Sequence, residues 1–249
     1  MKTLVKKSLI IFVMVISLFC SACTIDVQGM LGGGDKEVIN GIQENNVLSS
    51  NVTVLVYNYT HKKISQGSGV IYKAENGNYY AITNNHVVYE GYTFSVMDAY
   101  GDIWDARIER ADPNYDLAVV RFRMNTENEF YIPEMATEDP KIGDKIISIT
   151  NPLGVVNTVT LGTIKEYLSI ETLDTDTMMS DVGSNVKFDV IKHDAPINSG
   201  SSGGAIFNYD YKICGINFAS GRGENRKFIS GYAVQPTKIL EFLNNNNLN

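Results

Sequence analysis

Three short strings of the chain carry residue types that could perform chemistry together. The strings are YYAITNNHVV (79–88), DPNYDLAVV (112–120) and NSGSSGGAIF (198–207), with His86, Asp116 and Ser202 inside them. A serine hydroxyl is a weak nucleophile until a neighbouring base takes its proton, and histidine is the usual base. An aspartate holds that histidine in one tautomer and stabilises its protonated form. The chain order His, Asp, Ser is one of three in which this triad occurs, so we predict His86, Asp116 and Ser202 as catalytic residues.

The glycines around Ser202 fit the same chemistry. Attack on a carbonyl creates an oxyanion, which needs backbone N–H donors aimed at it. Gly200 can take turn conformations that let its own N–H and that of Ser202 converge, so we predict an oxyanion hole formed by Gly200, Ser201 and Ser202. In isolation, GSSGG is more often a flexible loop, and a histidine after a strand is more often structural. Their joint occurrence favours catalysis, whereas His61 and His193 have no comparable neighbours and are expected to be structural.

The elements that must position these residues are short strands. From about residue 50, β-rich runs alternate with Gly, Asn, Asp and Pro, a pattern typical of an all-β sandwich or of barrels. Only PTKILEFLNNN, at 236–246, has helical spacing, with proline at its start. Residues 23–48 are polar and rich in glycine, which predicts a flexible tether ahead of a domain at 49–249.

The first 22 residues have the features of a secretory signal. A basic start, MKTLVKK, is followed by an apolar run of about a dozen residues, which is shorter than the roughly 20 needed to span a bilayer. The segment CSAC resembles the bacterial lipoprotein cleavage box, which implies a lipid on Cys23 and attachment to the outer face of the cell membrane. A plain cleaved signal and a retained transmembrane anchor are the alternatives. With Cys20 removed and Cys23 lipidated, Cys214 would have no intrachain partner and would act as a small buried hydrophobe.

Composition excludes several classes of protein. The chain is 44% hydrophobic and 20% charged, which suits a packed core rather than disorder. Its formal net charge is −7, and loss of Lys2, Lys6 and Lys7 with the signal would make it three units more negative. An acidic domain of this kind argues against nucleic-acid binding and against a polybasic membrane patch. No metal or cofactor is expected.

The three strings, with others between them, resemble the protease domain of the HtrA/Deg group of trypsin-like serine peptidases. The resemblance covers residues 50–249. GSGVIYKAENGNYYAITNNHVV resembles that family's histidine motif, DPNYDLAVVRF its aspartate motif and HDAPINSGSSGGAIFN its serine motif. IGDKIISITNPLG, TVTLGTIKE and SGYAVQ are similar to further strands of the family. Two departures stand beside the nucleophile, where Ser199 and Ser201 replace the family's Pro and Asn.

The resemblance implies a fold and a specificity pocket. It implies two six-stranded antiparallel β-barrels, at about 50–133 and 134–249, with the triad between them and a C-terminal helix. In a departure from the family, no PDZ domain is expected after that helix. Residues expected to bind the substrate side chain are Pro196, Ile197, Ile216, Asn217 and Phe218. With no buried carboxylate among them, we expect cleavage after small or medium apolar residues.

Three functions stay open at this point. The first is an endopeptidase acting on proteins or peptides, with a role in extracytoplasmic protein quality control. The second is a catalytically silent barrel that binds surfaces, because a fold alone does not imply activity. The third is a glutamyl-specific relative of the same fold, which resembles this chain in GSSGG but uses a pocket histidine that GINFAS (215–220) lacks. The sequence does not indicate the oligomeric state.

Overall fold

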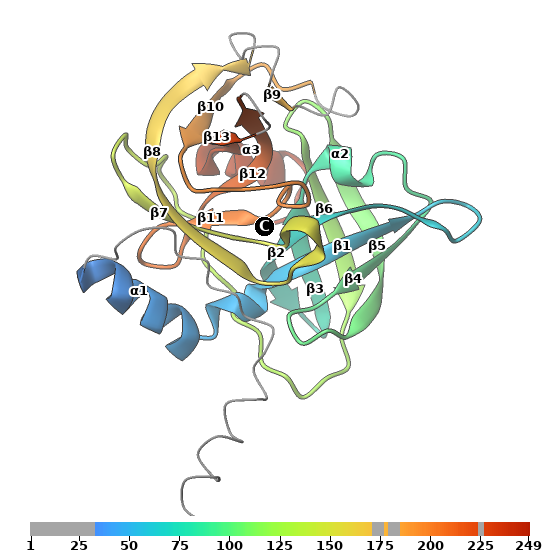
Figure 1. Ribbon diagram of the computed structural model, residues 1–249. Coiled ribbons are helices and arrows are strands. Elements are labelled where there is room, and N and C mark those ends of the chain that lie inside the picture. The colour runs from blue at the N-terminus through green and yellow to red at the C-terminus, as the bar shows by residue number, and fades with distance from the viewer. Residues whose placement is uncertain (1–32, 171–176, 179–184, 224–226) are drawn as a thin grey trace, which may run out of the picture.

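Two β-barrels, packed side by side, make up the body of the protein in the computed structural model (Figure 1). The structure describes residues 33–170, 177–178, 185–223 and 227–249. The predicted signal at 1–22, Cys23 and the first part of the tether therefore lie outside the described residues. Among the described helices, none is long and apolar enough to cross a membrane.

Barrel one is closed by six antiparallel strands in the order β1-β2-β3-β6-β5-β4. Its strands are β1 (Asn51–Tyr57), β2 (Lys63–Glu75), β3 (Asn78–Thr83), β4 (Thr93–Met97), β5 (Ile103–Asp112) and β6 (Leu117–Arg123). The short helix α2 (Asn85–Val88) follows β3. The exposed His61, at φ 59°, lies between β1 and β2.

Barrel two is formed by six strands in the order β11-β7-β8-β10-β13-β12, closed by pairing of β12 with β11. Its strands are β7 (Lys145–Thr150), β8 (Thr158–Ser169), β10 (Asp189–His193), β11 (Ala205–Phe207), β12 (Ile213–Arg222) and β13 (Phe228–Val234), and the two-residue β9 (Thr177–Met178) adds to β12. The turns η2 (Val47–Ser50) and η3 (Pro152–Gly154) precede β1 and β8. The predicted all-β fold with two six-stranded barrels is confirmed.

Strand β6 explains why the string LAVV is apolar without interruption. Side chains alternate between the two faces of a strand. Ala118 and Val120 pack with residues of barrel one only, whereas Leu117 and Val119 join a core that also contains Ile147 and other residues of barrel two. Strand β6 is thus buried on both faces, and the shared core fixes one barrel against the other.

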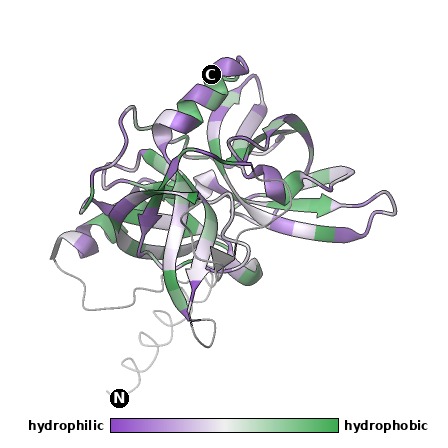
Figure 2. Ribbon diagram, turned by 90° about the horizontal axis from the view of Figure 1, so that it is seen from above, coloured by the Kyte–Doolittle hydropathy of each residue, from purple (hydrophilic) through white to green (hydrophobic). Residues whose placement is uncertain are grey.

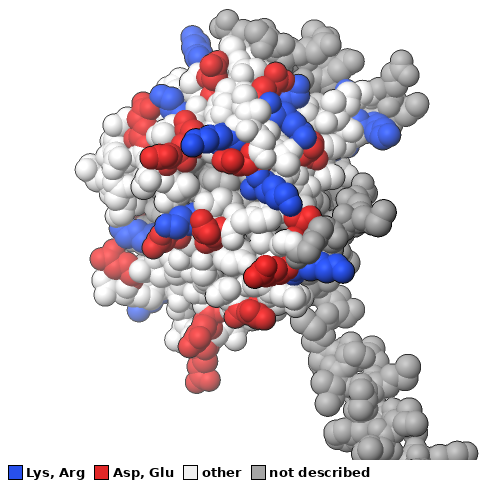
Figure 3. Space-filling model, turned by 90° about the vertical axis from the view of Figure 1, so that its left-hand side faces the viewer, with Lys and Arg blue, Asp and Glu red and all other residues white. Residues whose placement is uncertain are grey.

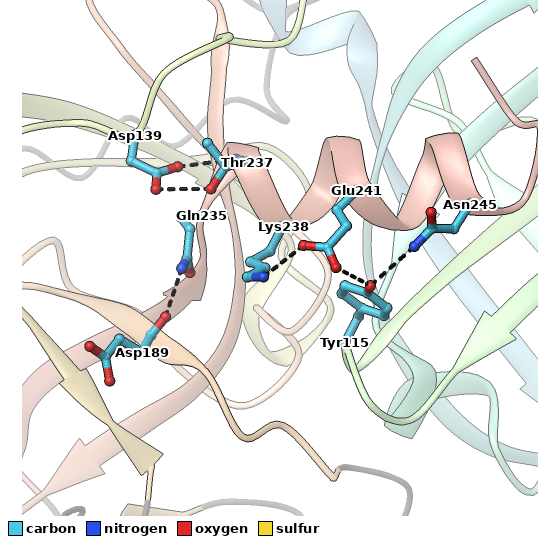
Figure 4. A network of polar contacts seen from close by, with 8 residues as sticks. All are labelled: Tyr115, Asp139, Asp189, Gln235, Thr237, Lys238, Glu241 and Asn245. Atoms are coloured by element: carbon cyan, nitrogen blue, oxygen red, sulfur yellow. Dashed lines mark hydrogen bonds and ion pairs between the residues drawn. The ribbon is translucent and has the colours of Figure 1, made fainter.

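The C-terminal helix α3 (Pro236–Asn245) confirms the helix predicted at 236–246. Ile239, Phe242 and Leu243 face the shared core. Figure 4 shows polar contacts at the start and in the middle of the helix: Thr237 donates to both carboxylate oxygens of Asp139, and Tyr115 donates to Glu241 at 2.7 Å. Because Tyr115 lies in the turn before Asp116, α3 ties the aspartate turn of barrel one to barrel two.

The tether prediction is wrong for residues 33–48. They form helix α1 (Gly33–Glu44) and the start of η2, and Val38, Ile42 and Val47 are buried in the shared core. Only Val38 and Ile42 form an apolar i, i+4 pair in α1, too short a pattern to read as an amphipathic helix. A residue far along the chain holds the helix, since the hydroxyl of Tyr211 donates to Val38 O at 3.0 Å. Glycine at position 41 allows this approach, because a side chain there would collide with Tyr211.

The outer surface is polar and mixed in charge. Hydrophobic residues concentrate on the strands and hydrophilic ones in the connecting loops (Figure 2). On the face shown in Figure 3, Lys and Arg are interspersed with Asp and Glu. That face therefore presents no extended field of one sign.

Candidate active site

His86 is held by helix α2 at the end of β3. Val87 and Val88, the next two residues, are both buried in the core of barrel one. Asn84, in an extended conformation before the helix, donates from its side chain to the carbonyl of Asp116 at 2.9 Å. Val87 and Val88 thus anchor the histidine, and the hydrogen bond of Asn84 holds the end of β3 against the turn that contains Asp116.

His86 and Asp116 form a doubly hydrogen-bonded pair. Nδ1 of His86 lies 2.7 Å from Oδ2 of Asp116, and the backbone N–H of His86 donates to Oδ1 at 2.9 Å. An ionised carboxylate only accepts hydrogen bonds, so the ring proton lies on Nδ1 and Nε2 is left able to accept a proton. This is the tautomer a general base for serine requires.

Asp116 is fully buried, and its backbone has φ 51°, a left-handed value that aspartate and asparagine tolerate better than most residues. Burial raises the pKa of its carboxyl, while the hydrogen bonds from His86 and from the backbone of Asn85 lower it. The carboxylate is therefore stabilised by fixed donors and not by solvent.

The loop around Ser202 has each carbonyl from residue 199 to 202 fixed by a donor. Ser199 O accepts from Leu153 N at 2.8 Å, and Ser201 O accepts from Gly204 N at 3.0 Å. Gly200 O accepts from the Ser68 hydroxyl at 2.7 Å, and Ser202 O accepts from Ser68 N at 2.8 Å. A peptide unit is planar, so each fixed carbonyl also fixes the N–H of the following residue.

Two N–H groups of this loop have no hydrogen-bond partner among the described residues, namely those of Gly200 and Ser202. Gly200 is at φ 91°, a region open to glycine, as the sequence predicted. The grouping of Ser201 with the donors was wrong, because its N–H is bonded to Asn198 O at 2.9 Å within the turn. The buried Ser201 hydroxyl instead contacts Thr150 Oγ1 at 3.1 Å and accepts from Asn198 N.

Strand β2 brings Ser202 and the histidine segment together. A side chain on Gly67 would lie 2.7 Å from Val87 Cγ2 and 3.0 Å from Ser202 O, so this glycine separates the residue after His86 from Ser202. No hydrogen bond joins the Ser202 hydroxyl to His86 in the described structure. Such bonds are often long before substrate binds. The catalytic roles therefore belong to the proposal below.

The five predicted substrate-binding residues lie near this loop but differ in how far their side chains are exposed. Pro196 is half-buried, Ile197 and Phe218 are 7% and 3% exposed, and Ile216 is fully buried. Asn217 is also fully buried, and its side-chain amide donates to Gly204 O and to Ser148 Oγ. Both amide hydrogens of Asn217 are thus occupied by the protein itself.

His193, expected to be structural, is hydrogen-bonded to the side chain of Asn217. Its Nε2 is 2.9 Å from Asn217 Oδ1, and its Nδ1 has no hydrogen-bond partner among the described residues. The ring is fully buried, which lowers its pKa to about 4 and keeps it neutral near pH 7. Cys214 is likewise buried and free, and burial raises the pKa of its thiol.

Four residues beside this loop were not predicted. They are Ser68, Asn151, Leu153 and Arg222, of which Asn151 bonds to Ser68 and the other three bond to the loop itself. The first three lie in the strings GSG and NPLG, whose resemblance to a family was visible, but their partners are distant in sequence. Arg222 donates to Asn198 Oδ1 at 2.8 Å and to Ile197 O. Within the described ranges, no cluster of three or more His, Cys, Asp or Glu side chains could hold a metal ion.

The comparison with family models decides the assignment, since residues 67–216, which enclose His86, Asp116 and Ser202, match the trypsin-like peptidase domain. The chain belongs to the trypsin-like peptidase family. Within that family it is homologous to the HtrA and DegP serine proteases. It is 32% identical over 158 residues to a probable periplasmic serine endoprotease DegP-like of Brucella suis, a match covering 64% of this chain and 28% of that protein. It is 36% identical over 157 residues to the serine protease Do-like HtrA of Bacillus subtilis, covering 61% of this chain and 32% of that protein. The family expected from the motifs is confirmed.

Solved structures of this trypsin-like peptidase fold show the same architecture. The active form of the Rv3671c protease from M. tuberculosis has a TM-score of 0.66 and 20% identity, with 88% of each chain covered. Its inactive form has a TM-score of 0.65 and 19% identity, covering 89% of this chain and 98% of that one. The curated relatives are longer, and the matched part of this chain spans roughly a third of their length or less.

Proposed function

We propose that this peptidase domain is an active serine endopeptidase with His86, Asp116 and Ser202 as its triad. The observation that supports it best is the loop at 199–204, in which the carbonyls of residues 199–202 are fixed and, among the described residues, only the N–H groups of Gly200 and Ser202 lack partners. Buried or half-buried donors without partners are costly unless a ligand uses them. An oxyanion that forms on the substrate would be such a ligand.

The chemistry follows from the geometry of the pair. His86 Nε2 takes the proton of the Ser202 hydroxyl while the serine oxygen bonds to the carbonyl carbon of the scissile peptide. Asp116 stabilises the resulting imidazolium through the 2.7 Å hydrogen bond to Nδ1. The imidazolium then gives its proton to the leaving amine, which departs from the acyl-enzyme. Water, activated by the same histidine, releases the acid and restores Ser202.

A fluorophosphonate probe and a peptide substrate test the proposal directly. The wild-type protein should be labelled once and should hydrolyse the peptide, and Ser202→Ala should do neither. Ser201→Ala is the matched control, since it removes a neighbouring hydroxyl that is bonded within the turn. Label on Ser202→Ala would contradict Ser202 as the nucleophile. Wild-type protein that neither reacts nor cleaves would support the silent surface-binding alternative.

For substrate preference, we propose small or medium apolar side chains on the acyl side of the cut. Ile197 and Phe218 offer apolar surface near the loop, and no carboxylate lies among the five predicted pocket residues to pair with Arg or Lys. Arg222, beside Ile197 and Asn198, is the one observation that favours the glutamyl-specific alternative. A peptide-library profile separates the two, because dominance of Glu, Arg or Lys would contradict apolar preference.

For location, we propose an extracytoplasmic protein held at the membrane by lipid on Cys23. Several relatives carry names that place them in the periplasm, and the string around Cys23 resembles the lipoprotein box. In that compartment, hydrolysis of damaged proteins would make it a quality-control protease. Metabolic labelling with a fatty-acid analogue should mark the wild type and not Cys23→Ser. Label that persists in Cys23→Ser would contradict this attachment site.

A further inference from the structure

One buried side chain of barrel one, Ser68, contacts the backbone of the loop that carries Ser202. Ser68 lies in the GSG string of β2 and is fully buried. Its hydroxyl donates to Gly200 O at 2.7 Å and its N–H donates to Ser202 O at 2.8 Å. These two carbonyls bracket the peptide that contains the Ser202 N–H, one of the two donors without a partner.

The direction of the Ser68 hydroxyl is fixed by a third contact. Asn151 N donates to Ser68 Oγ at 2.8 Å. A backbone N–H can only donate, so the serine oxygen accepts there and its own proton is left for Gly200 O. The hydroxyl therefore has one arrangement that satisfies both neighbours.

Asn151 is itself anchored in a buried network that joins the barrels. Its Nδ2 donates to Thr53 Oγ1 at 2.8 Å, and its Oδ1 accepts from Asn51 Nδ2 at 2.6 Å and from Asn157 N at 2.8 Å. Thr53 and Asn51 belong to β1 of barrel one. The chain of contacts thus runs from β1 through Asn151 to Ser68 and from there to Gly200.

The glycines on either side allow this close approach. A side chain on Gly203 would lie 2.1 Å from Ser68 O, and one on Gly69 would lie 3.1 Å from Val52 Cγ2. Strand β2 and the nucleophile loop are therefore in direct backbone contact. Such an arrangement has little freedom to adjust if the Ser68 hydroxyl is removed.

We propose that Ser68 is a positioning residue for the oxyanion hole. By holding the Gly200 and Ser202 carbonyls, it fixes the peptide units on either side of the one that carries the Ser202 N–H, so that this N–H faces the substrate. This inference rests on the proposed function. The contribution should be felt mainly in the transition state, because only there does negative charge develop against these donors. Loss of the hydroxyl should lower kcat and leave the affinity for an unreacted peptide nearly unchanged.

The test compares Ser68→Ala with wild type and with Ser50→Ala. Ser50 is a matched control, since it is equally buried and its hydroxyl donates only within its own turn, to Val47 O. We expect kcat of Ser68→Ala to fall by on the order of 10²-fold, with a parallel loss of affinity for a peptidyl boronic acid. The affinity for an unreacted peptide should differ by less than about threefold between the Ser202→Ala protein and the double variant that carries both Ser68→Ala and Ser202→Ala.

A second pair of variants keeps the test valid if Ser68→Ala folds poorly. Ser68→Thr and Ser68→Val introduce side chains of the same shape, of which only the first carries a hydroxyl. The kcat of Ser68→Thr should therefore be at least about tenfold higher than that of Ser68→Val. Equal kcat in this pair, or wild-type kcat and boronic acid affinity in Ser68→Ala, would overturn the inference. Wild-type and Ser50→Ala proteins that are both inactive would overturn the proposed function instead.

Discussion

At the scale of single residues, the site depends on side chains whose hydrogen bonds allow only one protonation state and one orientation. Asp116 accepts from both the ring and the backbone of His86, which fixes the tautomer as well as the orientation of the imidazole. His193 is the opposite case, a fully buried ring with one nitrogen unpartnered among the described residues.

Replacing Asp116 with Asn should lower kcat by about 10⁴-fold while the fold is kept. An amide can present a donor to Nδ1, which favours the tautomer with the proton on Nε2, and that nitrogen can then no longer accept the serine proton. Asparagine tolerates the left-handed backbone at this position, so little strain is added. Steady-state kinetics measure the loss. Asp112→Asn should keep near-normal turnover, because within the described part of the chain this carboxylate accepts only from Asn114 N in the same turn.

Replacing His193 with Gln should make stability less sensitive to acid. The folded pKa is about 4 and the ordinary value is 6.5, so on acidification the unfolded chain takes up the proton first. The stabilisation from the neutral ring is present above pH 6.5 and is lost as the pH falls toward 4, by up to roughly 3 kcal/mol. Urea unfolding at several pH values measures it. The exposed His61→Gln should follow the wild-type curve, and an unchanged slope in His193→Gln would contradict the buried neutral state.

At the scale of elements, helices join parts of the molecule that the strands leave separate. Helix α3 links the aspartate turn to barrel two through Tyr115 and Glu241 (Figure 4). Helix α1 fastens the chain before barrel one onto the shared core, with Asp35 bonded to Lys145 and to Tyr209. Residues 33–44 therefore contribute to stability and do not act only as a spacer.

Replacing Ile42 with Ala should destabilise the protein by about 2–5 kcal/mol, because the side chain is fully buried and its removal leaves a cavity. Denaturant unfolding measures the change, and catalytic turnover of the folded fraction should stay near wild type. The exposed neighbour Gln43→Ala should change stability by less than about 0.5 kcal/mol. Equal stability of the two variants would restore the flexible-tether interpretation.

At the scale of the whole molecule, the two barrels meet at a core and a polar network that together order the loop around Ser202. In digestive proteases of this fold, a freed N-terminal amine pairs with an aspartate before the nucleophile. Here that position is Ser201, buried and already bonded to Thr150 and Asn198. Inserting an ammonium group beside it would cost several kcal/mol without a compensating charge.

We therefore predict that activity needs no freed N-terminus. The chain from residue 24, prepared once with a blocked and once with a free N-terminal amine, should hydrolyse an apolar peptide with kcat equal within about twofold. Ser201→Asp, which supplies the missing carboxylate, is the complementary variant and should be destabilised in either form. Activity confined to the free-amine form would show that the loop is ordered by that amine after all.

The sequence by itself determined the short strands, the C-terminal helix and the family, because alternation, turn residues and motif strings are local patterns. It also predicted a triad of His86, Asp116 and Ser202, of which the structure joins the first two by hydrogen bonds, and the turn conformation of Gly200. Only the tertiary structure decided that the N–H of Ser201 is consumed, that Asn217 is held by His193, and that Ser68 supports the loop. These are hydrogen bonds between residues far apart in the chain, and a pattern in sequence does not say which distant partner a donor will meet. The same reason hid α1, whose buried residues Val38 and Ile42 can be recognised as core residues only once the core that covers them is known.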